Sequence, residues 1–112
     1  MVQLLSLFYQ RKILSPHSTD LLVRIMEQTA TGKRRIKGHL PAGSTVAHKT
    51  GMGGNHDGVI SAVNDVGVVT LPSGEHFAIA LFISNPKNSV PELEDLMADI
   101  SKLFFDHYSA TK

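Results

Sequence analysis

Three β-type segments in close succession restrict the fold of this chain more than any other feature. They are TVAHKT at 45–50, GVISAVNDVGVVTL at 58–71 and HFAIALFIS at 76–84. The PSGE stretch at 72–75 is typical of a turn, so the second and third segments are expected to pair as a hairpin. We therefore predict a three-stranded antiparallel sheet over residues 45–84.

A long amphipathic helix is predicted after the sheet, over residues 89–108. Ser89 and Glu92 have the S-x-x-E spacing of a capping box, and Pro91 stands in the first turn. Apolar residues then recur at three- and four-residue steps: Leu93, Leu96, Met97, Ile100, Leu103 and Phe104. Such a stripe needs an apolar surface to cover, and one face of the alternating strands offers it.

Two shorter helices are predicted before the sheet. The apolar residues of MVQLLSLFY recur at helical spacing with no cap ahead of them, as in a helix already under way. Ser15 is a candidate N-cap followed by Pro16, and the next helix would place four residues on one face: Leu21, Leu22, Ile25 and Met26. Residues 1–31 are thus expected to form a helical hairpin, with an irregular loop at 32–44.

The length allows only one domain, and the predicted helices and strands make it an α+β domain. A chain of 112 residues buries only about 65% of its unfolded surface, so no second core is expected. The net charge of +1 gives no general attraction to nucleic acid, and no aromatic residues interleave with the basic residues at 33–37. The six histidines lack metal-site spacing and there is no cysteine, so neither a metal nor a cofactor is expected.

The sequence shows no targeting or membrane segment. No window is apolar for the 18 or so residues that a membrane helix needs. The N-terminal residues have no basic segment ahead of the apolar ones and no small-residue cleavage site, so we do not interpret them as a signal peptide.

The strongest chemical signal is TVAHKTGMGG at 45–54. Lys49 supplies a compact positive charge and Thr50 a hydroxyl, both at the end of a predicted strand. Gly51 and Gly53 leave the backbone open, so that exposed N–H groups can meet an oxyanion or an extended substrate. Taken alone, the stretch is more typical of a strand that ends in a glycine-rich turn with a solvated lysine.

The surrounding residues favour the functional interpretation. TGKRRIKGHLP and LPAGSTVAHKTG together resemble the segment that leads into the Lys-Thr-Gly box of class A serine β-lactamases. The helical hairpin, the loop, the strands with NDVGVVTLP and the last helix follow the order of the C-terminal part of that family. AVNDVG and HFAIA suggest the extended-spectrum branch that includes the VEB and PER types.

The resemblance implies a role for five residues. Lys49 would anchor the substrate carboxylate and the network around the nucleophile, and Thr50 would hydrogen-bond that carboxylate. Gly51 and Met52 would line the bound acyl amide, with the Met52 N–H as one oxyanion-hole donor. Many relatives have Ser, Thr or Ala in place of Met52, so a side-chain hydroxyl contact is lost here. Arg35, fourteen residues before Lys49, would place a second positive charge beside the carboxylate, although a solvated basic loop would explain it equally well.

Three further polar residues are expected to be structural. His48 stands where several relatives carry Asp, and we interpret it as a structural side chain under the strand. Asn64 and Asp65 are expected to form a bulge or turn that interrupts a long strand.

The same resemblance implies a partner for this chain. In the family, a Ser-x-x-Lys box, a Ser-Asp-Asn loop and a deacylating glutamate complete the mechanism, and all three are expected outside this chain. The isolated chain should therefore be inactive, and a β-lactam site would require the N-terminal part of the same fold. The resemblance also implies a periplasmic or secreted location. A fragment of a penicillin-binding DD-peptidase or transpeptidase, or a non-catalytic relative, remains an alternative.

Overall fold

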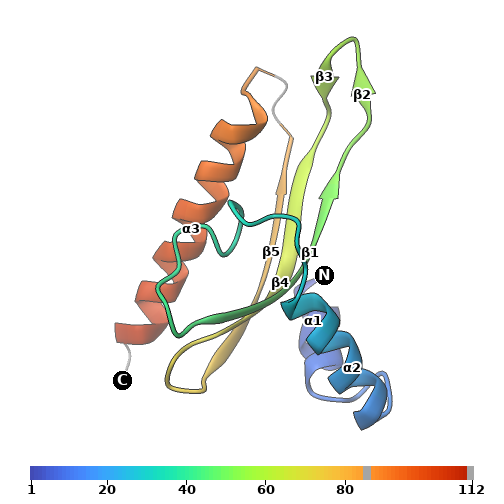
Figure 1. Ribbon diagram of the computed structural model, residues 1–112, viewed down its shortest axis with the longest axis vertical. Helices are drawn as coiled ribbons and strands as arrows, with labels where there is room; N and C mark the ends of the chain where they lie inside the picture. The colour runs from blue at the N-terminus through green and yellow to red at the C-terminus, as the bar shows by residue number, and fades with distance from the viewer. Residues whose placement is uncertain (85–86, 111–112) are drawn as a thin grey trace.

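The computed structural model describes residues 1–84 and 87–110. Within these ranges eight elements follow in chain order: α1 (Val2–Tyr9), α2 (Pro16–Glu27), β1 (Thr45–Met52), β2 (Asn55–His56), β3 (Val59–Ile60), β4 (Val63–Thr70), β5 (His76–Ile83) and α3 (Val90–Ala110). The three long strands form one antiparallel sheet in the order β1-β4-β5, and β2 pairs with β3 in a separate ladder (Figure 1). This arrangement confirms the predicted α+β fold.

The sheet lies between two helical layers. Val46 pairs with Val69 on the face that packs against Phe105 of α3, and the register places Lys49 and Val66 on the opposite face. On that opposite face, Val66 and Lys49 border α1 and α2. Figure 1 shows α3 running along one side of the sheet, with α1 and α2 on the other side, near the lower end of the view. Alternating side chains along β1 therefore meet different layers.

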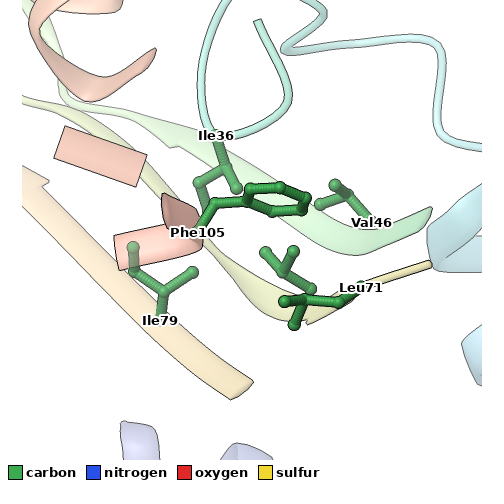
Figure 2. Close-up of a cluster of buried hydrophobic side chains, with 6 residues drawn as sticks. Ile36, Val46, Leu71, Ile79 and Phe105 are labelled. Carbon is green, nitrogen blue, oxygen red and sulfur yellow. The ribbon is translucent and has the colours of Figure 1, made fainter. Parts of the chain in front are cut away.

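The largest core cluster lies between the sheet and α3. Its buried members are Ile36, Val46, Val69, Leu71, Ile79 and Phe105. Figure 2 shows the Phe105 ring beside Val46 and Ile36. Ile36 comes from the loop between α2 and β1 and is fully buried, so the core also fixes this loop. Burial of one such aliphatic side chain stabilises a fold by about 2 kcal/mol.

Local sequence signals are confirmed at three element ends. The Ser15 hydroxyl accepts the Ser18 N–H at 3.2 Å and caps α2. The Ser89 hydroxyl donates to Glu92 at 2.9 Å and its N–H donates at 3.3 Å, which completes the capping box of α3. These hydrogen bonds hold the pKa of the Glu92 carboxyl below its ordinary value. The turn after β4 closes through the Leu71 N–H, which donates to Glu75 O at 2.7 Å.

Two details of the predicted sheet were wrong. Residues 58–71 are not one strand, because Asp57 and Gly58 have positive φ angles of 53° and 81° and form the turn of a short hairpin, β2–β3. Asn64 and Asp65 form no bulge: they lie in regular register opposite Gly51 and Thr50. A carboxylate in mid-strand is tolerated here because it is buried among hydrogen-bond donors, as described below.

Several apolar surfaces of the described residues remain exposed. On α2, the predicted apolar face is open: Leu21 is 47% exposed and Ile25 is 55% exposed. On α3, Leu93, Met97 and Phe105 are buried, whereas Leu103 is 70% exposed. Phe82 on the outer strand β5 is 61% exposed. The described elements therefore leave part of the apolar surface of α2, α3 and β5 uncovered.

Candidate functional site

The end of β1 presents backbone groups at an open edge. Gly53 donates its N–H to Ala62 O at 2.8 Å, which makes these two a hydrogen-bonded pair of the ladder between β1 and β4. Hydrogen-bonded and non-hydrogen-bonded pairs alternate in an antiparallel ladder. Counting back along the register, the N–H groups of Met52 and Thr50 therefore point away from β4. The Met52 N–H, the predicted oxyanion donor, thus points away from the sheet.

Lys49 lies on the α1–α2 side of the sheet and is exposed. Its ammonium donates to Thr50 O at 2.7 Å. Beside it is an apolar hollow of about 330 Å³, lined by Leu4, Leu5, Phe8, Ile13, Leu14, Leu22, Met26 and Val66.

Thr50 lies on the opposite face of β1 and is half-buried. Its hydroxyl is 3.0 Å from that of Thr31. Gly32 follows with a φ of +73°, and a Cβ there would lie 2.4 Å from the Thr50 side chain. Glycine is required at this point, since both the backbone conformation and the close approach exclude a larger residue. Thr31 and Gly32 together therefore hold the Thr50 hydroxyl in place.

Arg35 reaches the same end of β1 from the loop between α2 and β1. It is 5% exposed, and its Nε donates to Glu94 Oε2 of α3 at 3.0 Å. Its Nη1 donates to Gly51 O at 3.2 Å and to Asn64 O at 2.9 Å. The guanidinium therefore joins three elements, and Glu94 balances its charge. Sequence reasoning identified Arg35 but not Glu94, whose position fifty-nine residues away gives no local signal.

His48 and Asp65 form a buried pair beneath Lys49 and Thr50. Both are 0% exposed, and His48 Nδ1 is 2.9 Å from each oxygen of the Asp65 carboxylate. Asp65 Oδ2 also accepts the Ile36 N–H at 3.2 Å. The predicted structural role of His48 agrees with this burial. Asp65 was missed as a partner, although its place in the hairpin register, diagonal to His48, is a signal that could have found it.

The Ser-x-x-Lys spacing does occur twice in the chain: at 84–87, immediately after β5, and at 109–112, where residues 111–112 lie outside the described part of the chain. The Ser84 hydroxyl donates to Ser61 O at 2.7 Å, and Lys87 lies in a turn. In the nucleophile box the two residues must share one helical face, which is not the setting of Ser84 at the end of a strand. The intervening residues 85–86 lie outside the described part of the chain.

Neither a metal-binding cluster nor a membrane-spanning helix is found among the described residues. Across 1–84 and 87–110, no three His, Asp or Glu side chains gather where a metal ion could be held. Within the same ranges, no helix combines the length and the hydropathy of a membrane span.

Comparison with known proteins identifies the family. The model of the β-lactamase enzyme family matches residues 1–108. β-Lactamase VEB-1 of Pseudomonas aeruginosa is 41% identical over 99 residues, which cover 88% of this chain and 33% of that protein. Extended-spectrum β-lactamase PER-1 of Pseudomonas aeruginosa is 39% identical over 100 residues, covering 89% of this chain and 32% of that protein. The chain thus spans about a third of the length of these curated relatives.

Solved structures agree with this match. The TLA-1 extended-spectrum β-lactamase superposes with a TM-score of 0.90 at 45% identity, covering 96% of this chain and 39% of that chain. The structure of PBP-A superposes with a TM-score of 0.83 at 31% identity, covering 97% and 38%. Identity is thus higher to the β-lactamase than to PBP-A. The fold, the Lys-Thr-Gly strand end and these matches together show that the chain belongs to the β-lactamase enzyme family, in its class A branch.

Proposed function

We propose that this chain supplies the substrate-carboxylate side of a β-lactam-hydrolysing site. Lys49 and Thr50 bind the carboxylate, Gly51 and Met52 line the acyl amide, and the Met52 N–H serves as one oxyanion donor. The observation that carries the proposal is the end of β1, where an ammonium, a hydroxyl and an outward N–H come from four successive residues of an edge strand, 49–52. Hydrogen-bond donors fixed before reaction are what stabilises a developing oxyanion.

Arg35 adds positive potential from below this edge. Its guanidinium donates to Gly51 O, so Arg35 both holds the backbone of β1 in place and contributes positive charge near the proposed substrate side. Because Arg35 is 5% exposed, its hydrogen bond to Glu94 keeps the charge compensated while the site is empty.

The chain is further proposed to work with the remaining two thirds of the fold. Phe77–Ile83 is an uninterrupted apolar run without charge or proline, which is typical of a central strand, yet β5 is the outer strand of the sheet. β1, the opposite edge, carries the charge and the glycine that protect natural edges. The additional strands therefore belong beside β5, and β1 stays open for substrate.

The nucleophile and the general base of the reaction come from this second part. It would cover the apolar hollow beside Lys49 and bring its catalytic groups to the end of β1. Export to the periplasm or the medium, as implied by the family resemblance, completes the proposal. A transpeptidase or DD-peptidase function is less well supported, since identity is 45% to a β-lactamase structure and 31% to PBP-A.

The test is hydrolysis of a chromogenic cephalosporin by residues 1–112 joined to the upstream two thirds of the VEB-1 β-lactamase. Three samples are compared: the joined protein, residues 1–112 alone, and the upstream part alone. Hydrolysis by the joined protein only is the expected result. Hydrolysis by residues 1–112 alone would contradict the proposed division of the site. A joined protein that folds and acts on a D-alanyl-D-alanine peptide instead would favour the peptidase alternative.

A further inference from the structure

We propose that His48 and Asp65 form a positioning pair that fixes the carboxylate-binding end of β1 and the Arg35 loop in one arrangement. The inference rests on the proposed function, because the groups that it positions are those assigned to the substrate carboxylate. The proposed role of both residues is to orient neighbouring site residues and not only to fill space.

The contacts of the pair join three segments. His48 belongs to β1, Asp65 to β4, and the Ile36 N–H to the loop between α2 and β1. Each of the three is next to a residue of the site: His48 precedes Lys49, Asp65 pairs with Thr50 across the ladder, and Ile36 follows Arg35. A displacement of the Asp65 carboxylate would therefore move both sides of the carboxylate site.

The hydrogen bonds also determine the histidine tautomer. An ionised carboxylate can only accept, and it already accepts the Ile36 N–H at 3.2 Å. Nδ1 of His48, 2.9 Å from both carboxylate oxygens, is therefore the protonated nitrogen. Nε2 is buried and has no partner among the described residues. Nothing on that side of the ring opposes the tautomer set by Asp65.

The cost of this arrangement argues against a packing role. Both side chains are 0% exposed, and an apolar pair of similar volume would hold the strands together without burying a charge. What an apolar pair would lack is direction: the carboxylate orients the ring on one side and the Ile36 N–H on the other. Directional contacts of this kind fix the geometry of a site.

The experiment uses the joined protein of the preceding section with D65N, which is nearly isosteric. The asparagine carbonyl can still accept the Ile36 N–H, but its amide group then donates toward His48 Nδ1. We expect the proton to move to Nε2, because the amide group would otherwise meet the Nδ1–H donor. ¹⁵N spectra of labelled histidine, assigned with H48N, should show Nδ1–H in the parent and Nε2–H in D65N. KM for the cephalosporin should rise about tenfold, with kcat within about threefold.

The chain offers a matched control. His39 Nδ1 is 2.9 Å from Asp99 Oδ1, but this pair is exposed on the surface, at 47% and 68%. D99N should leave KM and the His48 tautomer unchanged. A second comparison separates direction from volume: H48N keeps an N–H donor for Asp65 and should retain KM better than H48L, which fills the space without a donor.

Three results would overturn the inference. They are an unchanged tautomer in D65N, a changed tautomer with unchanged KM, and an H48L variant at least as active as H48N. A folded parent protein without any hydrolysis would instead contradict the proposed function. In that case the pair is judged by the tautomer and by the amide shifts of Thr50 and Arg35, which should move in D65N and not in D99N.

Discussion

Arg35 and Arg34 are neighbours in the chain with different surroundings. The Arg35 and Glu94 side chains are 7% and 16% exposed, and Arg35 also donates to two carbonyl groups. The Arg34 and Asp95 side chains are each 58% exposed, and their contact is 3.3 Å long. From the sequence, TGKRR indicated only that one arginine of a basic run could face the site, because burial depends on residues of α3 that are distant in the chain.

R35M should lower the free energy of unfolding by about 3 kcal/mol, since it leaves the part-buried Glu94 carboxylate without its partner and removes the side-chain donor to Gly51 O and Asn64 O. R34M is the matched control and should change it by less than about 0.5 kcal/mol. Urea denaturation of the joined protein measures both. Equal effects of the two substitutions would contradict the buried network.

Gly67 marks the closest approach within the sheet. A Cβ at Gly67 would lie 2.3 Å from Ala47 O and 2.8 Å from His48 Cβ. G67A should therefore cost about 2 kcal/mol or more of stability. At Gly51, a Cβ would meet its nearest atom, of Asn64, at 3.7 Å, so G51A should change stability by less than about 1 kcal/mol. Denaturation midpoints of the two variants give the comparison, and a G67A protein as stable as G51A would refute the strand packing described here.

At the scale of elements, sequence signals succeeded where one residue type decides the local structure. Ser15, the Ser89–Glu92 box and the Gly74 turn all act over three or four residues, and all three are found. The β2–β3 hairpin was missed because Asp57 and Gly58 interrupt a run whose composition is otherwise continuous β. The bulge predicted at Asn64 and Asp65 was wrong because the partners of Asp65 come from another strand and from the loop.

The stability of the first turn of α3 should decrease at acidic pH. Hydrogen bonds from the Ser89 side chain and backbone lower the pKa of Glu92 below its ordinary value of 4.5. A carboxyl with a lowered pKa stabilises the folded state fully above its unfolded value and loses this contribution as the pH falls through its folded value. Amide exchange at Leu93, whose N–H donates to Ser89 O, should therefore accelerate as the pH falls below 4.5, after correction for intrinsic exchange.

E92Q should remove this pH dependence at Leu93. D106N, at the other end of α3, is the control and should leave it intact. A pH dependence that persists in E92Q would assign the acid response to another group.

At the scale of the whole molecule, the exposed apolar faces favour association of the isolated chain with other molecules. β5 has its outer edge unpaired within the described residues, and Phe82 on it is 61% exposed. α2 and α3 expose further apolar side chains, and unpaired apolar edges associate with one another. We expect residues 1–112 alone to self-associate.

F82K should reduce this association by placing a charge on the β5 edge. S109K adds the same charge at an exposed residue of α3 and should have no comparable effect. Sedimentation velocity of the isolated chain measures both. A parent chain that is monomeric and unfolds cooperatively would show that the edge needs no partner.

The most direct test of the central claim is the kinetics of K49M in the joined protein. Lys33 is also exposed but lies in the loop, so K33M controls for the loss of one positive charge. If Lys49 anchors the substrate, K49M should lower kcat/KM for a chromogenic cephalosporin by about 10²-fold, and K33M should leave it within about twofold. Equal activity of K49M and K33M would contradict the assignment of the β1 end as the carboxylate site.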